Sequence, residues 1–165
     1  MLKLFWAITM VNLATLIAAG GLGYWHVAGT LPAAAGGAHI LAGALASIVC
    51  IGVHCIVFTY FIATAKWAQH AVSVKKLEAA ILAPTRSFKA QAFPAALASM
   101  AAVFATLVLG VLLDAGYSLP RAVHHAAAWL AFGVNLAAAA VEHRAIARNG
   151  RLIDRILELI NTRQN

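Results

Sequence analysis

Charged residues are scarce in this sequence, and acidic residues are the scarcest. Of its 165 residues, 12 are Lys or Arg and 5 are Asp or Glu; 10% are charged in all, whereas 63% are hydrophobic. A soluble domain usually has about 25% charged and about 45–50% apolar residues. The shortage of charge therefore excludes an ordinary soluble domain and favours an integral membrane protein.

The sequence also lacks the short motifs of soluble enzymes. It contains no CxxC, no HExxH, no Gly-rich loop after a strand and no apparent Ser-His-Asp arrangement. We therefore expect no activity of the chain on its own. Its two cysteines, Cys50 and Cys55, lie on one expected helix about 140° apart around the axis, which does not allow a disulfide between them.

The net charge of +7 does not indicate a nucleic-acid-binding protein. Basic residues that bind nucleic acid cluster on a polar surface, often together with aromatic side chains. Here they lie at the ends of apolar segments, where they act as signals of membrane topology. We expect the lipid bilayer, and no nucleic acid, as a partner.

Four apolar segments are long enough to cross the hydrocarbon core of a bilayer, which takes about 20 helical residues. They cover residues 4–25, 38–65, 92–114 and 121–147. The third loop, with Gly116 and Pro120, is so short that the last two segments must be antiparallel neighbours. The sequence thus predicts an all-α fold, a polytopic four-transmembrane-helix up-down bundle over residues 1–149.

The first segment has a second interpretation, a cleaved signal peptide, because Lys3 precedes an apolar run that ends in small residues. The run is long for such a signal and contains Trp6 and Asn12, which favours a membrane span.

The basic residues predict the orientation of the four spans. Arg121 lies alone on one side. The other side carries Lys3, Lys66, Lys75, Lys76, Arg86, Lys89, Arg144, Arg148, Arg151, Arg155 and Arg163. The positive-inside rule then places the N-terminus and the C-terminus in the cytoplasm, and we expect a bacterial inner (cytoplasmic) membrane.

Two helical stretches are expected beyond the membrane on this side. The second span is predicted to continue past Trp67 to about Ile81. After a break at Asn149-Gly150, residues 150–165 form a short amphipathic cytoplasmic tail, with Leu152, Ile153, Ile156, Leu157 and Ile160 on one face. This face would bind lipid headgroups, a partner subunit or the bundle itself.

Each span has one face of small and polar residues at helical spacing. In a bilayer such a face contacts protein and not lipid. The predicted inward residues are Asn12, Thr15, Ala19, Gly23 and His26; His39, Gly43, Ala46, Cys50 and His54; Ser99, Ala102, Thr106, Gly110 and Asp114; and His124, Ala128, Ala131, Asn135, Ala138 and Glu142.

The histidines on the second and fourth spans suggest b-type haem. The second span carries His39 and His54, about 22 Å apart, and the fourth carries His124, His125 and His143. Imidazole is a good ligand of haem iron, and two histidines on each of two parallel helices is the arrangement of a dihaem membrane cytochrome. The chain would then be an electron-transfer or membrane-anchor subunit with respiratory-type or other membrane partners, or a homo-oligomer.

Three alternatives remain open. His26, His39, His124 and Asp114 lie at one membrane level and would suit zinc or copper at the outer face. An oligomeric ion or proton channel would use His54 and Asn135 as midplane polar groups, with acidic residues at the span ends. A cofactor-free accessory or assembly subunit needs neither, because His54 can hydrogen-bond to neighbouring helices.

Overall fold

The computed structural model describes residues 1–29 and 35–162, which form helices and turns with no strand. The long helices are α1 (Leu2–Val27), α2 (Ala35–Val74), α3 (Pro84–Asp114) and α4 (Arg121–Thr162). A short 3-10 helix, η1 (Ala79–Leu82), joins α2 to α3. Four helical segments are long and apolar enough to cross a membrane, which confirms the all-α fold and the four apolar helices.

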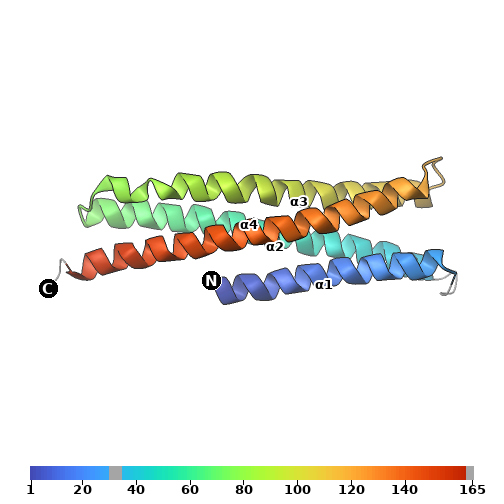
Figure 1. Cartoon of the computed structure of the whole chain (residues 1–165), viewed down its shortest axis with the longest axis horizontal. Coiled ribbons are helices and arrows are strands. Elements are labelled where there is room, and N and C mark those ends of the chain that lie inside the picture. The colour runs from blue at the N-terminus through green and yellow to red at the C-terminus, as the bar shows by residue number, and fades with distance from the viewer. Residues whose placement is uncertain (30–34, 163–165) are drawn as a thin grey trace.

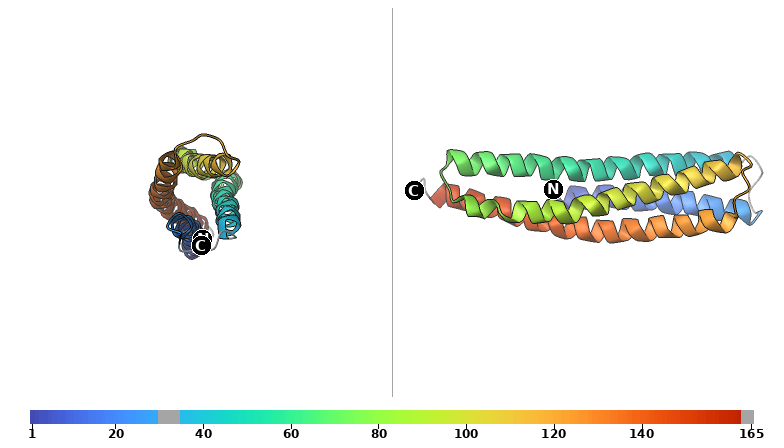
Figure 2. Two further views of the ribbon diagram at one scale, coloured as in Figure 1. Left: turned by 90° about the vertical axis from the view of Figure 1, so that its right-hand side faces the viewer. Right: turned by 90° about the horizontal axis from the view of Figure 1, so that it is seen from above.

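Successive helices run in opposite directions, so α2 and α4 run in the same direction (Figure 1). The closest-packed pairs are α3 with α4 and α1 with α2. Seen from one end, the four helices surround a common axis (Figure 2). The N-terminus lies part-way along the bundle, and α2, α3 and α4 continue beyond it (Figures 1 and 2).

The molecule therefore has two parts, which we call the four-helix part and the three-helix extension. The four-helix part is the length of the bundle that α1 covers. The extension consists of residues 61–74 of α2, η1, residues 84–92 of α3 and residues 147–162 of α4. A continuous apolar core links the two parts, since Phe5 of α1 belongs to the same buried cluster as Phe88 and Ile156 of the extension.

α2 ends at Val74, seven residues before the predicted end at Ile81. Lys76 adopts a left-handed conformation, with φ of 50°. The amide of Leu77 donates to the Val72 carbonyl at 3.0 Å and that of Lys76 to the Ser73 carbonyl at 3.3 Å, the pattern of a Schellman cap. Leu77 then packs against the core, which fixes the turn into η1 and α3.

α4 shows no break at Asn149-Gly150 and runs on to Thr162, contrary to the predicted start of a separate tail. The side-chain nitrogen Nδ2 of Asn149 donates to Thr64 Oγ1 on α2 at 2.9 Å, and both Leu152 and Ile156 are buried against α2 and α3. A glycine inside a helix costs about 1 kcal/mol, and this packing offsets it. The apolar face of the tail thus belongs to the core of the extension. Residues 163–165 lie outside the described residues.

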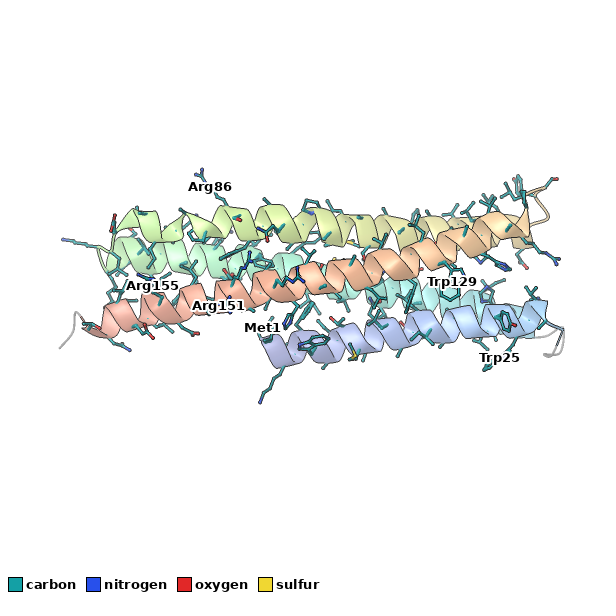
Figure 3. The ribbon with its side chains drawn as sticks, in the orientation of Figure 1. Met1, Trp25, Arg86, Trp129, Arg151 and Arg155 are labelled. Atoms are coloured by element: carbon teal, nitrogen blue, oxygen red, sulfur yellow. The ribbon has the colours of Figure 1, made fainter. Side chains whose placement is uncertain are left out.

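The predicted inward faces are confirmed for all four helices. Every residue of that set is buried or half-buried except His26 and Asp114, which lie at helix ends and are exposed. Large apolar side chains cover the outside of the four-helix part, and Trp129 is 76% exposed. Figure 3 shows Trp25 and Trp129 on this part, with Arg86, Arg151 and Arg155 on the extension.

Candidate functional site

A cluster of amide and thiol groups holds α1, α2 and α4 together at the middle of α1. Asn12 Nδ2 donates to Asn135 Oδ1 at 3.0 Å, and the Cys50 thiol approaches the same oxygen at 3.5 Å. Asn135 Nδ2 donates to the Ala131 carbonyl at 2.9 Å. Since all three side chains are buried, these contacts fix the heights of the three helices relative to one another.

A buried contact between an imidazole and a carboxylate joins α2 to α4, on the side of this cluster toward the N-terminus of α1. His54 Nδ1 lies 2.8 Å from Glu142 Oε1, and the residues are 2% and 1% exposed. A carboxylate only accepts hydrogen bonds, so Nδ1 of the imidazole is the donor. The second ring nitrogen, Nε2, is buried with no hydrogen-bond partner. The distance between the two charged-group atoms is that of a salt bridge when the imidazole is protonated.

The His54–Glu142 pair lies nearer to the N-terminal end of α1 than to its middle. His143, the neighbour of Glu142 in sequence, packs its ring against Trp6 with 5.1 Å between ring centroids. His54 therefore lies toward the N-terminal end of α1, although it is near the centre of the long apolar helix α2. Glu142, which the channel hypothesis placed at a span end, is a fully buried carboxylate, because it occupies the inner face of α4 beside the imidazole.

A pair of histidines marks the opposite end of the four-helix part. His39 of α2 donates from Nδ1 to the Ala19 carbonyl at 3.0 Å. Its ring lies directly against Gly23, where an added Cβ would be 2.6 Å from Cε1. The ring of His124 lies in the same way against Gly110 of α3, with 3.0 Å from an added Cβ to its Cε1. Each ring thus fits a space that a glycine leaves open.

The rings of His39 and His124 face each other between α2 and α4, with 6.1 Å between centroids and an interplanar angle of 80°. A metal–imidazole bond is about 2 Å and a ring centre lies about 1 Å behind its nitrogen, so two imidazoles on one metal have centres about 6 Å apart. His39 already uses Nδ1 for the Ala19 carbonyl, which leaves Nε2 for a ligand, the usual arrangement of a metal-binding histidine.

The other predicted ligands are not gathered at this pair. The exposed ring of His125 lies 6.1 Å from that of His124, on the outer side. His26 and Asp114 are exposed. In the part of the chain that the structure describes, no three His, Cys, Asp or Glu side chains form a group suited to a metal ion. At the other end, His54 meets Glu142, while His143 meets Trp6.

Sequence reasoning placed His39, His54, His124 and Glu142 on inward faces but did not pair them. Helical spacing gives the face of each residue, whereas pairing depends on the heights of α2 and α4, which packing and loops decide. The Ala19 carbonyl, Gly23 and Gly110 were missed as partners of the histidine rings, although both glycines lie on the predicted inward faces.

Comparisons with known proteins give no relative: no protein-family model, curated protein or solved structure matches the chain.

Proposed function

We propose that the chain is an integral membrane protein whose four-helix part crosses the bilayer, with both termini on the cytoplasmic side of a bacterial inner membrane. The exposed apolar side chains of this part support the proposal, because water would penalise so large an apolar surface. The basic residues of the extension lie on one side, as the positive-inside rule requires. The extension then projects into the cytoplasm.

Within this frame, we propose that His39 and His124 bind one b-type haem between α2 and α4. The observation that carries this proposal is the 6.1 Å separation of the two rings, each seated against a glycine. His39 and His124 would hold the haem iron through their imidazole nitrogens, and the bound haem would supply the one-electron chemistry. The Ala19 carbonyl orients one of the two rings, as second-shell groups do in metal sites.

The number of ligands favours haem over zinc or copper at this end. A structural zinc site takes four protein ligands and a catalytic one takes three, which His26 and Asp114 would have to complete. Both of these side chains are exposed and join no metal-binding group among the described residues. The macrocycle of haem supplies the remaining four ligands itself, so two histidines suffice.

The same geometry argues for one haem and not two. His54 and His143 would be the ligands of a second haem, but the structure does not bring them together: His54 contacts Glu142 and His143 packs against Trp6. One haem at the outer end of the bundle can exchange electrons only near that membrane face. We therefore propose an electron-transfer or anchor role within a larger membrane complex or a homo-oligomer.

The test is the absorption spectrum of the full chain, produced with ample haem supply and purified in detergent. We expect a Soret band and, after reduction, an α-band at about 560 nm, typical of bis-histidine haem b. His39→Ala and His124→Ala should each abolish the low-spin spectrum, while the matched control His125→Ala should keep it. A colourless wild-type protein overturns haem binding and favours a cofactor-free accessory subunit; metal analysis of the same sample tests zinc and copper.

A further inference from the structure

Two buried hydroxyl groups of the four-helix part are exceptions among the helical threonines and serines. Most helical hydroxyls here donate to a backbone carbonyl three or four residues earlier, namely those of Thr15, Ser47, Thr59, Thr64, Thr106 and Thr162. Thr9 Oγ1 on α1 and Ser99 Oγ on α3 have no hydrogen-bond partner, although both residues are buried. Local backbone bonding therefore does not satisfy these two groups.

Four unpartnered buried polar atoms belong to neighbouring turns of the bundle. They are Thr9 Oγ1, Asn12 Oδ1, His54 Nε2 and Ser99 Oγ. Asn12 and Cys50 both contact Asn135 Oδ1. Thr9 and His54 are each about one helical turn from these residues, toward the extension. On α3, Phe93 packs against Phe58 and Phe61 of α2. Ser99 is about two turns further along α3, which places it at the height of Cys50 and His54 on α2.

These atoms form what we call the polar layer, between the Asn12–Asn135 contact and the His54–Glu142 pair. A buried polar atom with no partner costs about 1–3 kcal/mol, so four of them in neighbouring turns would be a large penalty for one bundle. Buried water occurs where two to four such groups converge, and it makes about three hydrogen bonds. Hydroxyl, amide oxygen and imidazole nitrogen supply both donors and acceptors for it.

We propose that the polar layer and the His54–Glu142 pair together form a proton-binding site served by internal water. With Glu142 ionised and Nδ1–H of His54 donating to it, the pair carries one negative charge. A proton delivered by water binds at Nε2, which turns the neutral imidazole into imidazolium and leaves an uncharged ion pair. The proton thus arrives at the ring nitrogen that faces the polar layer.

On the side of the extension, a hollow open to solvent comes close to the pair. A hollow of about 270 Å³ lies where α1 begins, lined by Met1, Leu2, Tyr60, Ile146, Gly150 and Asp154 among others. Ile146 is one helical turn from Glu142, and Asp154 brings an exposed carboxylate to the hollow. The hollow therefore ends about one turn from the buried pair, on the side that we propose is cytoplasmic.

No competing titratable group faces the pair from α1 or α3. Within residues 1–29 and 35–162, the buried titratable side chains are Cys50, His54 and Glu142, from α2 and α4. From α1 and α3, the buried polar side chains near this level are the neutral Thr9, Asn12 and Ser99. The nearest other imidazole, His143, packs against Trp6. Cys50, one turn from His54 on the same helix, is the other titratable group beside the imidazole, so a readout at the nitrogens of His54 is needed to assign a titration to the pair.

The first experiment tests for internal water by asking whether one substitution, Thr9→Val, raises or lowers the unfolding midpoint. Thr9→Val keeps the shape of the side chain and removes its hydroxyl. If Oγ1 binds water, the variant lowers the unfolding midpoint of the full chain in detergent relative to wild type. If Oγ1 has no partner, removing it raises the midpoint, which overturns the proposal. Thr15→Val is the control, because its hydroxyl bonds only to its own helix, and it should change the midpoint least.

The second experiment follows the proton itself, by ¹⁵N NMR of the histidine-labelled full chain in lipid nanodiscs. We expect Nε2 of His54 to change from the unprotonated to the protonated shift as bulk pH is lowered. Glu142→Gln, which keeps the side-chain shape and removes the charge, should move this transition to lower pH. A His54 signal that stays constant over the whole pH range in which the protein remains folded overturns the proposal. Neither readout depends on haem, so failure of haem binding leaves both results interpretable.

Discussion

The tightest contact at the histidine pair gives the sharpest test of the site. Replacing Gly23 by Ala puts a methyl group 2.6 Å from His39 Cε1, whereas non-bonded carbons pack at about 3.5–4.0 Å. The imidazole must move by close to 1 Å, and its 3.0 Å hydrogen bond to the Ala19 carbonyl cannot survive that shift. The change therefore acts on ring position and leaves both histidines in the sequence.

The magnitude follows from a comparison with Gly20→Ala on the same helix, where an added Cβ meets nothing within 4 Å. Both variants gain about 0.5–1 kcal/mol from the reduced backbone entropy of alanine. Gly23→Ala also loses a hydrogen bond worth about 0.5–1.5 kcal/mol, and overpacking adds about 1–3 kcal/mol. We expect Gly23→Ala to be less stable than Gly20→Ala by about 1.5–4.5 kcal/mol in the four-helix part.

The assay is reversible unfolding of the full chain in mixed detergent micelles, followed by circular dichroism. The absorption spectrum of the same samples gives a second readout. Gly20→Ala should keep the wild-type haem content and Gly23→Ala should lose most of it, since the ligand ring is displaced. Equal stability and equal haem content of the two variants would refute the inferred position of His39.

Three further predictions test the rest of the molecule. Glu142→Ala should lower the free energy of unfolding by about 3–5 kcal/mol in the same assay, because it leaves its imidazole partner buried alone. Glu142→Gln, which retains an acceptor, should lower it by about 1 kcal/mol, and similar values for the two variants would contradict the buried pair. Ile156→Ala should destabilise the extension by about 2–5 kcal/mol and speed amide exchange there, while Leu157→Ala, at an exposed position, should change little. In sealed inverted vesicles, a water-soluble thiol reagent should label Ser73→Cys and spare Ser118→Cys; the reverse pattern would contradict the proposed orientation.

The four helices and their inner faces could be predicted because both follow from the period of one helix. Asn12, Cys50 and Asn135 were assigned inward from spacing alone, and all three are buried. Lipid-compatible segments make this inference strong, since a polar side chain on the outer face has no partner. His26 and Asp114 were also predicted to face inward but are exposed, because they lie at helix ends, where the helix face no longer determines burial.

The ends of the helices were harder to predict because packing overrides local signals. Asn149 and Gly150 are typical of a helix end, yet the contact of Asn149 with Thr64 and the burial of Leu152 keep α4 continuous. Conversely, α2 stops at Val74 because Leu77 gains a place in the core. Neither contact is visible along the sequence, since each joins residues that only the folded bundle brings together.

The contact between His54 and Glu142 could not be predicted from the sequence for another reason. An error of one turn in the height of α4 would bring a different side chain opposite the imidazole, and sequence gives heights no better than that. A proton relay usually contains a buried carboxylate, and Glu142, which the sequence placed at a span end, provides one.

Because α4 is unbroken, one continuous helix connects the His39–His124 end of the bundle to the extension. Asn135 is held by α1 and α2; 11 residues separate it from His124 on one side and 27 from Thr162 on the other. At 1.5 Å per residue these arms are about 16 Å and about 40 Å long. Glu142, Asn149 and Ile156 also bind α4 to its neighbours, so the helix cannot tilt about Asn135 alone. A displacement at the His124 end is therefore transmitted along the axis of α4, through one continuous helix, to the extension.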